Sequence, residues 1–107
     1  DNVSENYFKV EKQSKYPKVI RDFSFILNDD IKFIELQELI SNTSKLIKKI
    51  DLVDVYKGSQ IDNSKKSYSI SVTLEEKKKT LDEIEINRIS DKIIKNVNKE
   101  LNGEIRS

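Results

Sequence analysis

A carboxylate, a phenol ring and a hydroxyl occur at two neighbouring places near the middle of the sequence. Asp54 and Tyr56 are separated by one residue, and Ser67 opens the next run of alternating residues. An aromatic ring can stack on an unpaired nucleobase, and carboxylate and hydroxyl oxygens can hydrogen-bond to the edge of that base. Nearby cations that could meet phosphates are Lys57, Lys65 and Lys66. This set of residue types is typical of a surface that binds single-stranded nucleic acid.

Two predicted strands must bring these side chains together. In the run 52–58, Val53 and Val55 alternate with Leu52, Asp54 and Tyr56, and the period of two predicts a strand with two different faces. The run 67–74 alternates serines and a threonine with an apolar set: Tyr68, Ile70, Val72 and Leu74. If residues 57–66 join the two runs as an antiparallel hairpin, the trio of Asp54, Tyr56 and Ser67 clusters on the polar, uncovered face.

The first part of the chain predicts one strand and one helix. Residues 19–27 alternate, so we expect Phe23, Phe25 and Leu27 in the core and Asp22 and Ser24 on the open face. The next apolar residues follow helical spacing and predict a helix from Phe33 with one buried stripe. That stripe comprises Phe33, Leu36, Leu39, Ile40 and Thr43.

The last part predicts a longer helix and a short final strand. Asp82 followed by Glu85 is a helix-starting pattern, and a glycine after Asn102 is a common stop, since glycine accepts the left-handed conformation. The aliphatic stripe between them comprises Ile86, Ile89, Ile93, Val97 and Leu101. Residues 104–106 remain for a last strand.

The predicted order is strand, helix, strand, strand, helix, strand. This order predicts an α+β fold of the ferredoxin-like, split βαβ type, a sandwich in which two helices cover one face of a four-stranded antiparallel sheet. The other face carries the predicted functional residues: Asp22, Ser24, Asp54, Tyr56, Ser67 and Ser69. We expect residues 1–15 to be a linker from a preceding domain, which would make the chain a fragment of a longer protein, and residues 16–107 to form the domain.

Composition excludes several classes of function. The chain has 107 residues, of which 36% are hydrophobic and 36% are charged, and it contains no cysteine and no histidine. The usual ligands of transition metals and the usual nucleophile–base pairs are therefore absent, which excludes thiol enzymes and Ser-His-Asp hydrolases. We expect no metal site and no catalytic residue. No apolar run is long enough for a membrane span.

The charge is unevenly distributed along the chain. The net charge is only +1, but residues 45–79 contain nine lysines and five acidic residues, a local balance of +4. The excess falls on the two central strands and their flanks, where a polyanion would dock. A lysine-rich surface that only binds water is the alternative reading of the same charges.

Several short motifs, taken in order, resemble one family: the ferredoxin-fold anticodon-binding domain at the C-terminal end of the beta subunit of bacterial phenylalanyl-tRNA synthetase. The resemblance runs from Lys15 to Arg106. The motifs are Ser14-Lys15-Tyr16-Pro17 with Arg21-Asp22, the run Asp54 to Gly58, Lys65-Lys66-Ser67, Thr80-Leu81 with Glu85-Ile86-Asn87, and Leu101 to Arg106.

The resemblance implies a non-catalytic module of a ligase that serves protein biosynthesis. It implies that Asp54, Tyr56 and Ser67 surround the first anticodon base, a guanine, with Arg106 and Arg21 as further RNA contacts or supports. The implied partners are the tRNA(Phe) anticodon stem-loop, the alpha subunit and the rest of the beta subunit in a heterotetramer. ATP and magnesium are implied for the full enzyme but no cofactor for this domain, and the implied location is the cytoplasm, with no membrane.

Two other classes of binding module share the expected topology. A small-ligand-binding regulatory module would need a glycine-rich loop, and the chain has only Gly58 and Gly103. A general single-stranded RNA-binding module usually carries several aromatic residues on its third strand, where this chain has Tyr68 alone, with inward parity. Binding of tRNA with and without a changed anticodon separates these alternatives.

Overall fold

The computed structural model describes residues 16–106, which form two helices and four strands. The elements are β1 (Val19–Asn28), α1 (Phe33–Ser41), β2 (Ile47–Tyr56), β3 (Lys65–Leu74), α2 (Glu83–Leu101) and β4 (Glu104–Ile105). The predicted order of elements is confirmed, although β2 starts earlier than the alternating run suggested. The expected linker at residues 1–15 lies outside the described residues.

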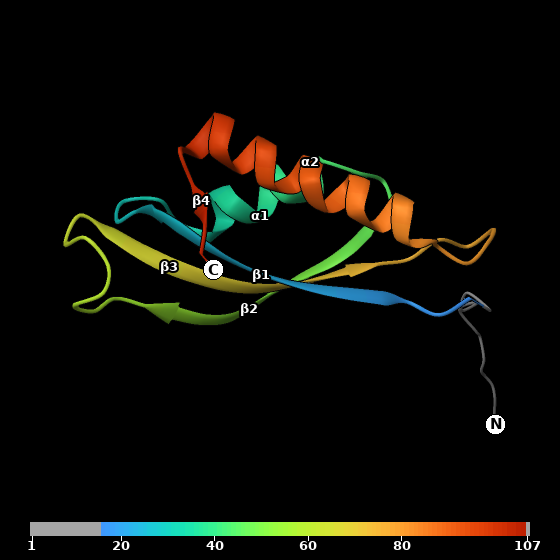
Figure 1. Ribbon diagram of the computed structural model, residues 1–107, viewed down its shortest axis with the longest axis horizontal. Coiled ribbons are helices and arrows are strands. Elements are labelled where there is room, and N and C mark those ends of the chain that lie inside the picture. The colour runs from blue at the N-terminus through green and yellow to red at the C-terminus, as the bar shows by residue number, and fades with distance from the viewer. Residues whose placement is uncertain (1–15, 107) are drawn as a thin grey trace, which may run out of the picture.

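The four strands form one antiparallel sheet in the order β2-β3-β1-β4. Figure 1 shows α1 and α2 on the same side of this sheet, with the opposite side left open. The two central strands, β1 and β3, pair along their whole length, from Val19 opposite Leu74 to Asn28 opposite Lys65. This is the ferredoxin-like α+β arrangement predicted from the sequence.

The core lies between the sheet and the helices, as the alternation predicts. In β1, Phe25 and Leu27 are fully buried and Phe23 nearly so. In β3 the buried side chains are Tyr68, Ile70, Val72 and Leu74. The hydroxyl of Tyr68 donates a 2.7 Å hydrogen bond to the Ile31 carbonyl, so the inward parity predicted for Tyr68 is confirmed.

The edge strand β2 departs from simple alternation at two places. Its register against β3 shifts between Ile47 and Lys49 and again between Leu52 and Asp54. Because of the second shift, Leu52 lies opposite Ile70, which is buried under the helices, whereas Asp54 lies opposite Ser69. The prediction that Leu52 shares a face with Asp54 and Tyr56 is therefore wrong, since a bulge adds one residue and reverses the alternation across it.

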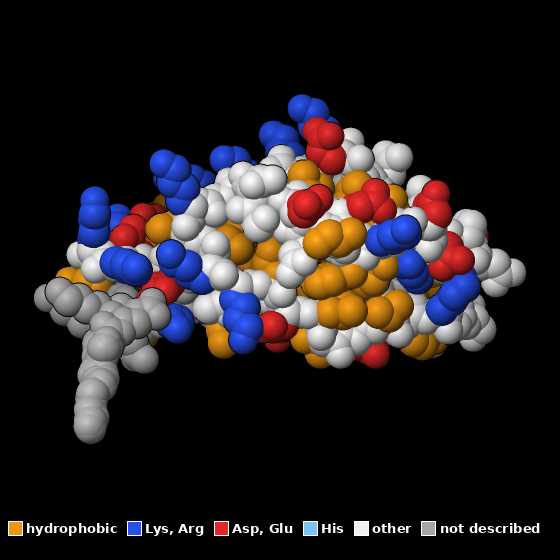
Figure 2. Space-filling view, turned by 180° about the vertical axis from the view of Figure 1, so that it is seen from behind, with side chains coloured by type: hydrophobic (Ala, Val, Ile, Leu, Met, Phe, Trp, Pro, Cys, Tyr) orange, Lys and Arg blue, Asp and Glu red, His pale blue; other side chains and the backbone are white. Residues whose placement is uncertain are grey.

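The side of the molecule formed by α1 and β2 carries exposed apolar residues. Figure 2 shows this side, on which hydrophobic side chains gather among charged ones. Exposed large hydrophobic residues of the two elements are Ile34, Leu52, Val53 and Val55. The bulge in β2 accounts for part of this exposure, because it displaces Val53 from the regular ladder.

The helix starts follow local hydrogen-bonding rules. The carboxylate of Asp82 accepts a 2.8 Å hydrogen bond from the backbone N–H of Glu85, which confirms the predicted cap of α2. At α1, the Glu35 carboxylate accepts from the backbone N–H of Lys32 at 2.9 Å. That helix ends at Ser41, so the predicted stripe residue Thr43 lies just beyond it, although it is buried.

The end of α2 differs from the prediction in one detail. The left-handed residue is Asn102, with φ of 54°, and not Gly103. Asparagine tolerates this conformation better than most residues. Gly103 is required for space instead, because a Cβ atom there would collide with Leu27 and Val97 of the core. In the part of the chain that the structure describes, no helix has the length and apolar character needed to cross a membrane.

Candidate nucleic-acid interface

The strand pairing brings Asp54, Tyr56 and Ser67 together on the open face. Tyr56 lies directly opposite Ser67, and Asp54 lies opposite Ser69, so the carboxylate and the ring project from the same face of β2. Directly opposed side chains in antiparallel strands have Cβ atoms about 5 Å apart. Asp54 is exposed and forms no hydrogen bond or ion pair with any described residue. Its carboxylate oxygens are thus available as acceptors.

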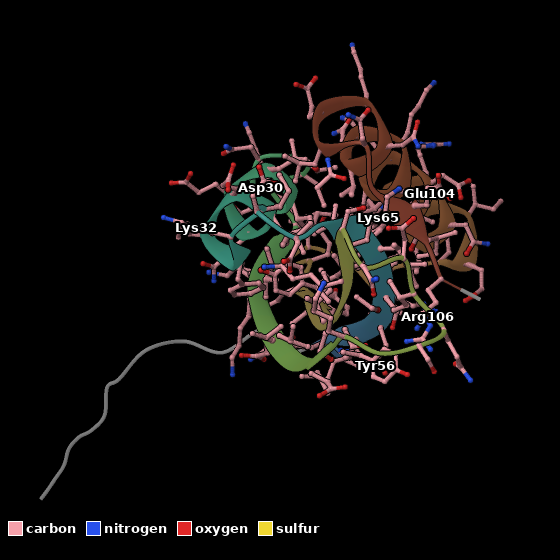
Figure 3. All side chains as sticks on the ribbon, turned by 90° about the vertical axis from the view of Figure 1, so that its left-hand side faces the viewer. Asp30, Lys32, Tyr56, Lys65, Glu104 and Arg106 are labelled. Carbon is pink, nitrogen blue, oxygen red and sulfur yellow. The ribbon has the colours of Figure 1, made fainter. Side chains whose placement is uncertain are left out.

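Arg106 lies against the ring of Tyr56. The backbone N–H of Arg106 donates a 2.7 Å hydrogen bond to the Ser24 carbonyl of β1, directly after β4. Its guanidinium carbon is 4.9 Å from the centre of the Tyr56 ring, within the range of a cation–π contact. Figure 3 shows both side chains on the side of the sheet away from the helices. Two of the residues predicted to bind RNA therefore contact each other.

The side chains of Arg106 and Tyr56 meet over the open face of the sheet. The backbone of Arg106 is bonded to β1 and its guanidinium lies over a ring of β2, and β3 lies between those two strands. Ser67 belongs to β3, with Ile26 on one side and Tyr56 on the other. Although Ser67 belongs to the open face, it is 0% exposed. The open face is thus covered at this point by its own side chains.

The hydroxyl of Ser67 has no hydrogen-bond partner among the described residues. Its neighbours on the same face are satisfied: the hydroxyls of Ser24 and Ser69 are 2.8 Å apart, and Ser71 donates to the Asp22 carboxylate at 2.7 Å. A buried hydroxyl without a partner costs about 1–3 kcal/mol. Ser67 therefore retains an unused donor and acceptor directly beside the Tyr56 ring.

The loop 57–64 fixes the end of β2 that carries Tyr56. The ammonium of Lys57 donates to the backbone carbonyls of Asn63 at 2.6 Å and Lys65 at 3.0 Å, and it lies 3.6 Å from the Asp29 carboxylate. Hydrogen bonds from the backbone N–H and hydroxyl of Ser64 lower the pKa of Asp62 below its ordinary value. Lys57 is thus tied to the loop and is less free to meet a phosphate than the sequence suggested.

Gly58 makes room for the Tyr56 ring. A Cβ atom at Gly58 would overlap the hydroxyl end of that ring. The ring is therefore held close to the Gly58 backbone while Arg106 lies over it. Gly58 was not among the predicted site residues, although a glycine two positions after an outward tyrosine is the sequence signal for it.

Arg21 lies elsewhere, near the start of β1. It is opposite Val72, whereas the site is near Ile26 and Ser67. One guanidinium nitrogen is 3.3 Å from the Glu83 carboxylate of α2, and another donates to the Ile20 carbonyl at 3.2 Å. The structure therefore does not bring Arg21 together with the other predicted site residues, and its described contacts are those of a structural support.

The site has the chemistry of a binding surface. It offers a flat ring, a free carboxylate, a hydroxyl without a partner among the described residues and a guanidinium, which are groups able to stack on or hydrogen-bond to a base or, for the guanidinium, to bind a phosphate. Within residues 16–106, no three acidic side chains converge in a way that would hold a metal ion.

Comparison with known sequences identifies a family and several similar proteins. Residues 14–106 match the family described as the ferredoxin-fold anticodon binding domain. The phenylalanine–tRNA ligase beta subunit of Bacteroides thetaiotaomicron is 37% identical over 94 residues, which cover 87% of this chain and 12% of that protein. The corresponding subunit of Fusobacterium nucleatum is 40% identical over 96 residues, covering 90% of this chain and 12% of its own length.

A chloroplastic relative extends the comparison beyond bacteria. The beta subunit of Phaeodactylum tricornutum is 34% identical over 108 residues, covering 99% of this chain and 15% of that protein. The chain thus spans only about an eighth of the length of the relatives it matches. The fold, the open face with its aromatic site and the match over residues 14–106 agree, and the chain belongs to the ferredoxin-fold anticodon binding domain family.

Proposed function

We propose that this chain is the anticodon-binding module of a phenylalanine–tRNA ligase beta subunit. The curated relatives carry that name, and the chain corresponds to a small part of each. In this proposal the module holds the anticodon loop of tRNA(Phe), and another part of the enzyme performs the aminoacylation with ATP and magnesium. Its partners are the remainder of the beta subunit and the alpha subunit, in a cytoplasmic heterotetramer.

The observation that carries the proposal is the pairing of Tyr56 with Ser67 beside the free carboxylate of Asp54. We propose that the ring of Tyr56 stacks on the first anticodon base and that Asp54 accepts hydrogen bonds from the N–H groups on the edge of a guanine. Ser67 supplies a hydroxyl bond to the same base. Arg106 belongs to this site, and Arg21 supports the packing of β1 against α2.

One observation disfavours the general single-stranded RNA-binding alternative. The only aromatic residue of β3 is Tyr68, which is 4% exposed and bonded to the Ile31 carbonyl. A buried ring cannot stack on a base, so β3 lacks the stacking residues that such modules use. The stacking role falls to β2 instead.

The central test is binding of an anticodon stem-loop RNA to the full chain with Tyr56→Ala. We expect an affinity loss of about 1–3 kcal/mol, the range for one lost base stack, measured by fluorescence anisotropy of labelled RNA. The matched control is Tyr56→Phe, which retains the ring and should bind almost as the parent chain does. Equal affinity of the alanine and phenylalanine variants would contradict the stacking role.

A second prediction concerns which base is read. Asp54→Ala should weaken discrimination between guanine and other bases at the first anticodon position more than it weakens overall affinity, because base contacts specify and phosphate contacts position. Stem-loops that differ only at that position provide the measurement. A uniform loss for all four bases would show that Asp54 has a structural role.

A further inference from the structure

The stacking surface proposed for the base is already occupied in the free molecule. The guanidinium of Arg106 lies 4.9 Å from the centre of the Tyr56 ring. A guanidinium is flat and stacks on aromatic faces as a base does. The hydroxyl end of the ring also lies close to the backbone of Gly58, where even a Cβ atom would not fit. The guanidinium and the Gly58 backbone therefore both limit the access of a base to the ring.

The Ser67 half of the site is covered as well. Ser67 lies between Ile26 of β1 and Tyr56 of β2, is completely buried, and has no hydrogen-bond partner for its hydroxyl among the described residues. In this arrangement the Ser67 hydroxyl is inaccessible to a nucleotide, and Tyr56 is only partly exposed. Of Asp54, Tyr56 and Ser67, only Asp54 is exposed.

We infer that Arg106 is a removable cap on the base site, and that a nucleobase binds by exchanging with its guanidinium. The inference rests on the proposed function and adds to it an order of events. We call the arrangement with the guanidinium over the ring the closed form. When a base binds, the Tyr56 ring exchanges the guanidinium for the base, and the Ser67 hydroxyl gains a hydrogen-bonding partner that the closed form lacks. The displaced guanidinium is then free to meet an RNA phosphate, for which its fork of donors is well suited.

The closed form is suited to opening. A cation–π contact near the surface is weak, and an unpartnered buried hydroxyl makes the closed form less favourable. The backbone of Arg106 is held independently of its side chain, through the 2.7 Å bond to Ser24. The side chain can therefore move while β4 and the backbone of Arg106 stay in place.

The cap also makes a prediction about selectivity. A phosphate backbone alone can bind Arg106, but it provides no ring to stack on Tyr56 and no base edge to bond to Ser67. Only an RNA with a base at the right position replaces both contacts. We therefore expect the cap to open for a stem-loop with guanine at the first anticodon position and to stay closed for a stem-loop that is abasic there.

The test uses the full chain and nuclear Overhauser contacts between the Arg106 side chain and the Tyr56 ring protons. The free chain should show them, and the Arg106 Nε–H should show a ring-current shift that is lost in Tyr56→Leu. Arg21, paired with Glu83, is the internal reference whose Nε–H should not move. Absence of both signals in the free chain would overturn the cap, whatever RNA does.

The second arm adds saturating RNA. With the guanine stem-loop the Arg106–Tyr56 contacts should disappear, and with the abasic stem-loop they should persist. Contacts that persist with guanine bound, or that vanish equally with abasic RNA, would overturn the exchange and leave the proposed function standing. If neither RNA binds, the proposed function fails and the exchange fails with it, while the free-chain signals still decide whether the cap exists.

Discussion

Two arginines that the sequence assigned to one role lie in different environments. Arg106 bonds through its backbone to β1 and places its guanidinium over Tyr56, on the open face. Arg21 lies near the other end of β1, where its guanidinium is paired with Glu83 of α2. Arg106 is held by its backbone, and its side chain can leave the Tyr56 ring. Arg21 joins β1 to α2 through its side chain.

This difference shows that the role of a charged side chain depends on the contacts that it already makes. The Arg21 ion pair is exposed on both sides, with 39% and 71% of the two side chains accessible, so it contributes little stability. The contact of Arg106 is also weak, but it covers the ring of Tyr56, to which the proposed function assigns the stacking role. The region around Arg106 is therefore arranged for exchange, and the region around Arg21 for support.

The largest expected effect is a loss of stability on substitution of Gly103, which lies between α2 and the strand that leads to Arg106. Gly103→Ala should lower the free energy of unfolding by about 1–3 kcal/mol, because the added methyl group overpacks the core at Leu27 and Val97. Urea denaturation measures it. The matched control, Asn102→Gly, keeps the left-handed conformation and should change stability by less than about 0.5 kcal/mol. Equal effects of the two would show that the backbone conformation, and not space, is critical here.

An intermediate effect is expected at the covered hydroxyl. Ser67→Ala should raise the free energy of unfolding by about 1 kcal/mol, because it removes a buried polar group that has no partner within residues 16–106. Ser69→Ala is the control on the same strand and should lower stability by a similar amount, since it leaves the Ser24 hydroxyl unpaired. Thermal or urea unfolding of the two variants gives the comparison. Changes of the same sign would contradict the difference between the two hydroxyls.

The smallest effect is expected at Arg21. Arg21→Ala should reduce stability by less than about 1 kcal/mol, and the loss should shrink at high salt, because the ion pair with Glu83 is exposed. Glu83→Ala should have the same effect, and the double variant should lose no more than either single variant. RNA affinity that falls far more in Arg21→Ala than in the charge-matched Arg88→Ala would instead place Arg21 in the interface.

The strongly periodic elements could be predicted from the sequence. In β1, β3 and α2 every apolar residue of the repeat faces the same core, so the period alone identifies the buried face. The clustering of Tyr56 with Ser67 followed from their places at the two ends of the predicted hairpin loop, and the structure pairs them directly. This is why a set of site residues could be named before any coordinates.

Three features depended on contacts that no local pattern contains. The bulge at Leu52 is set by the match of β2 to Ile70 and Ser69, and the alternating residues of β2 fit a regular strand equally well. Ser67 is buried between Ile26 and Tyr56, which belong to two other strands. The choice of Asn102 over Gly103 as the left-handed residue depends on how closely Leu27 and Val97 approach.

The two irregularities of β2 have a consequence for how the chain behaves among its copies. A border strand with regular unpaired amides is a template on which a second molecule can add its own strand, and exposed valines such as Val53 and Val55 would favour that. Register shifts at Ile47 and at Leu52 interrupt the template twice along β2. A second copy that paired with β2 would not find a regular row of backbone hydrogen-bonding groups. The interruptions therefore disfavour aggregation through this edge.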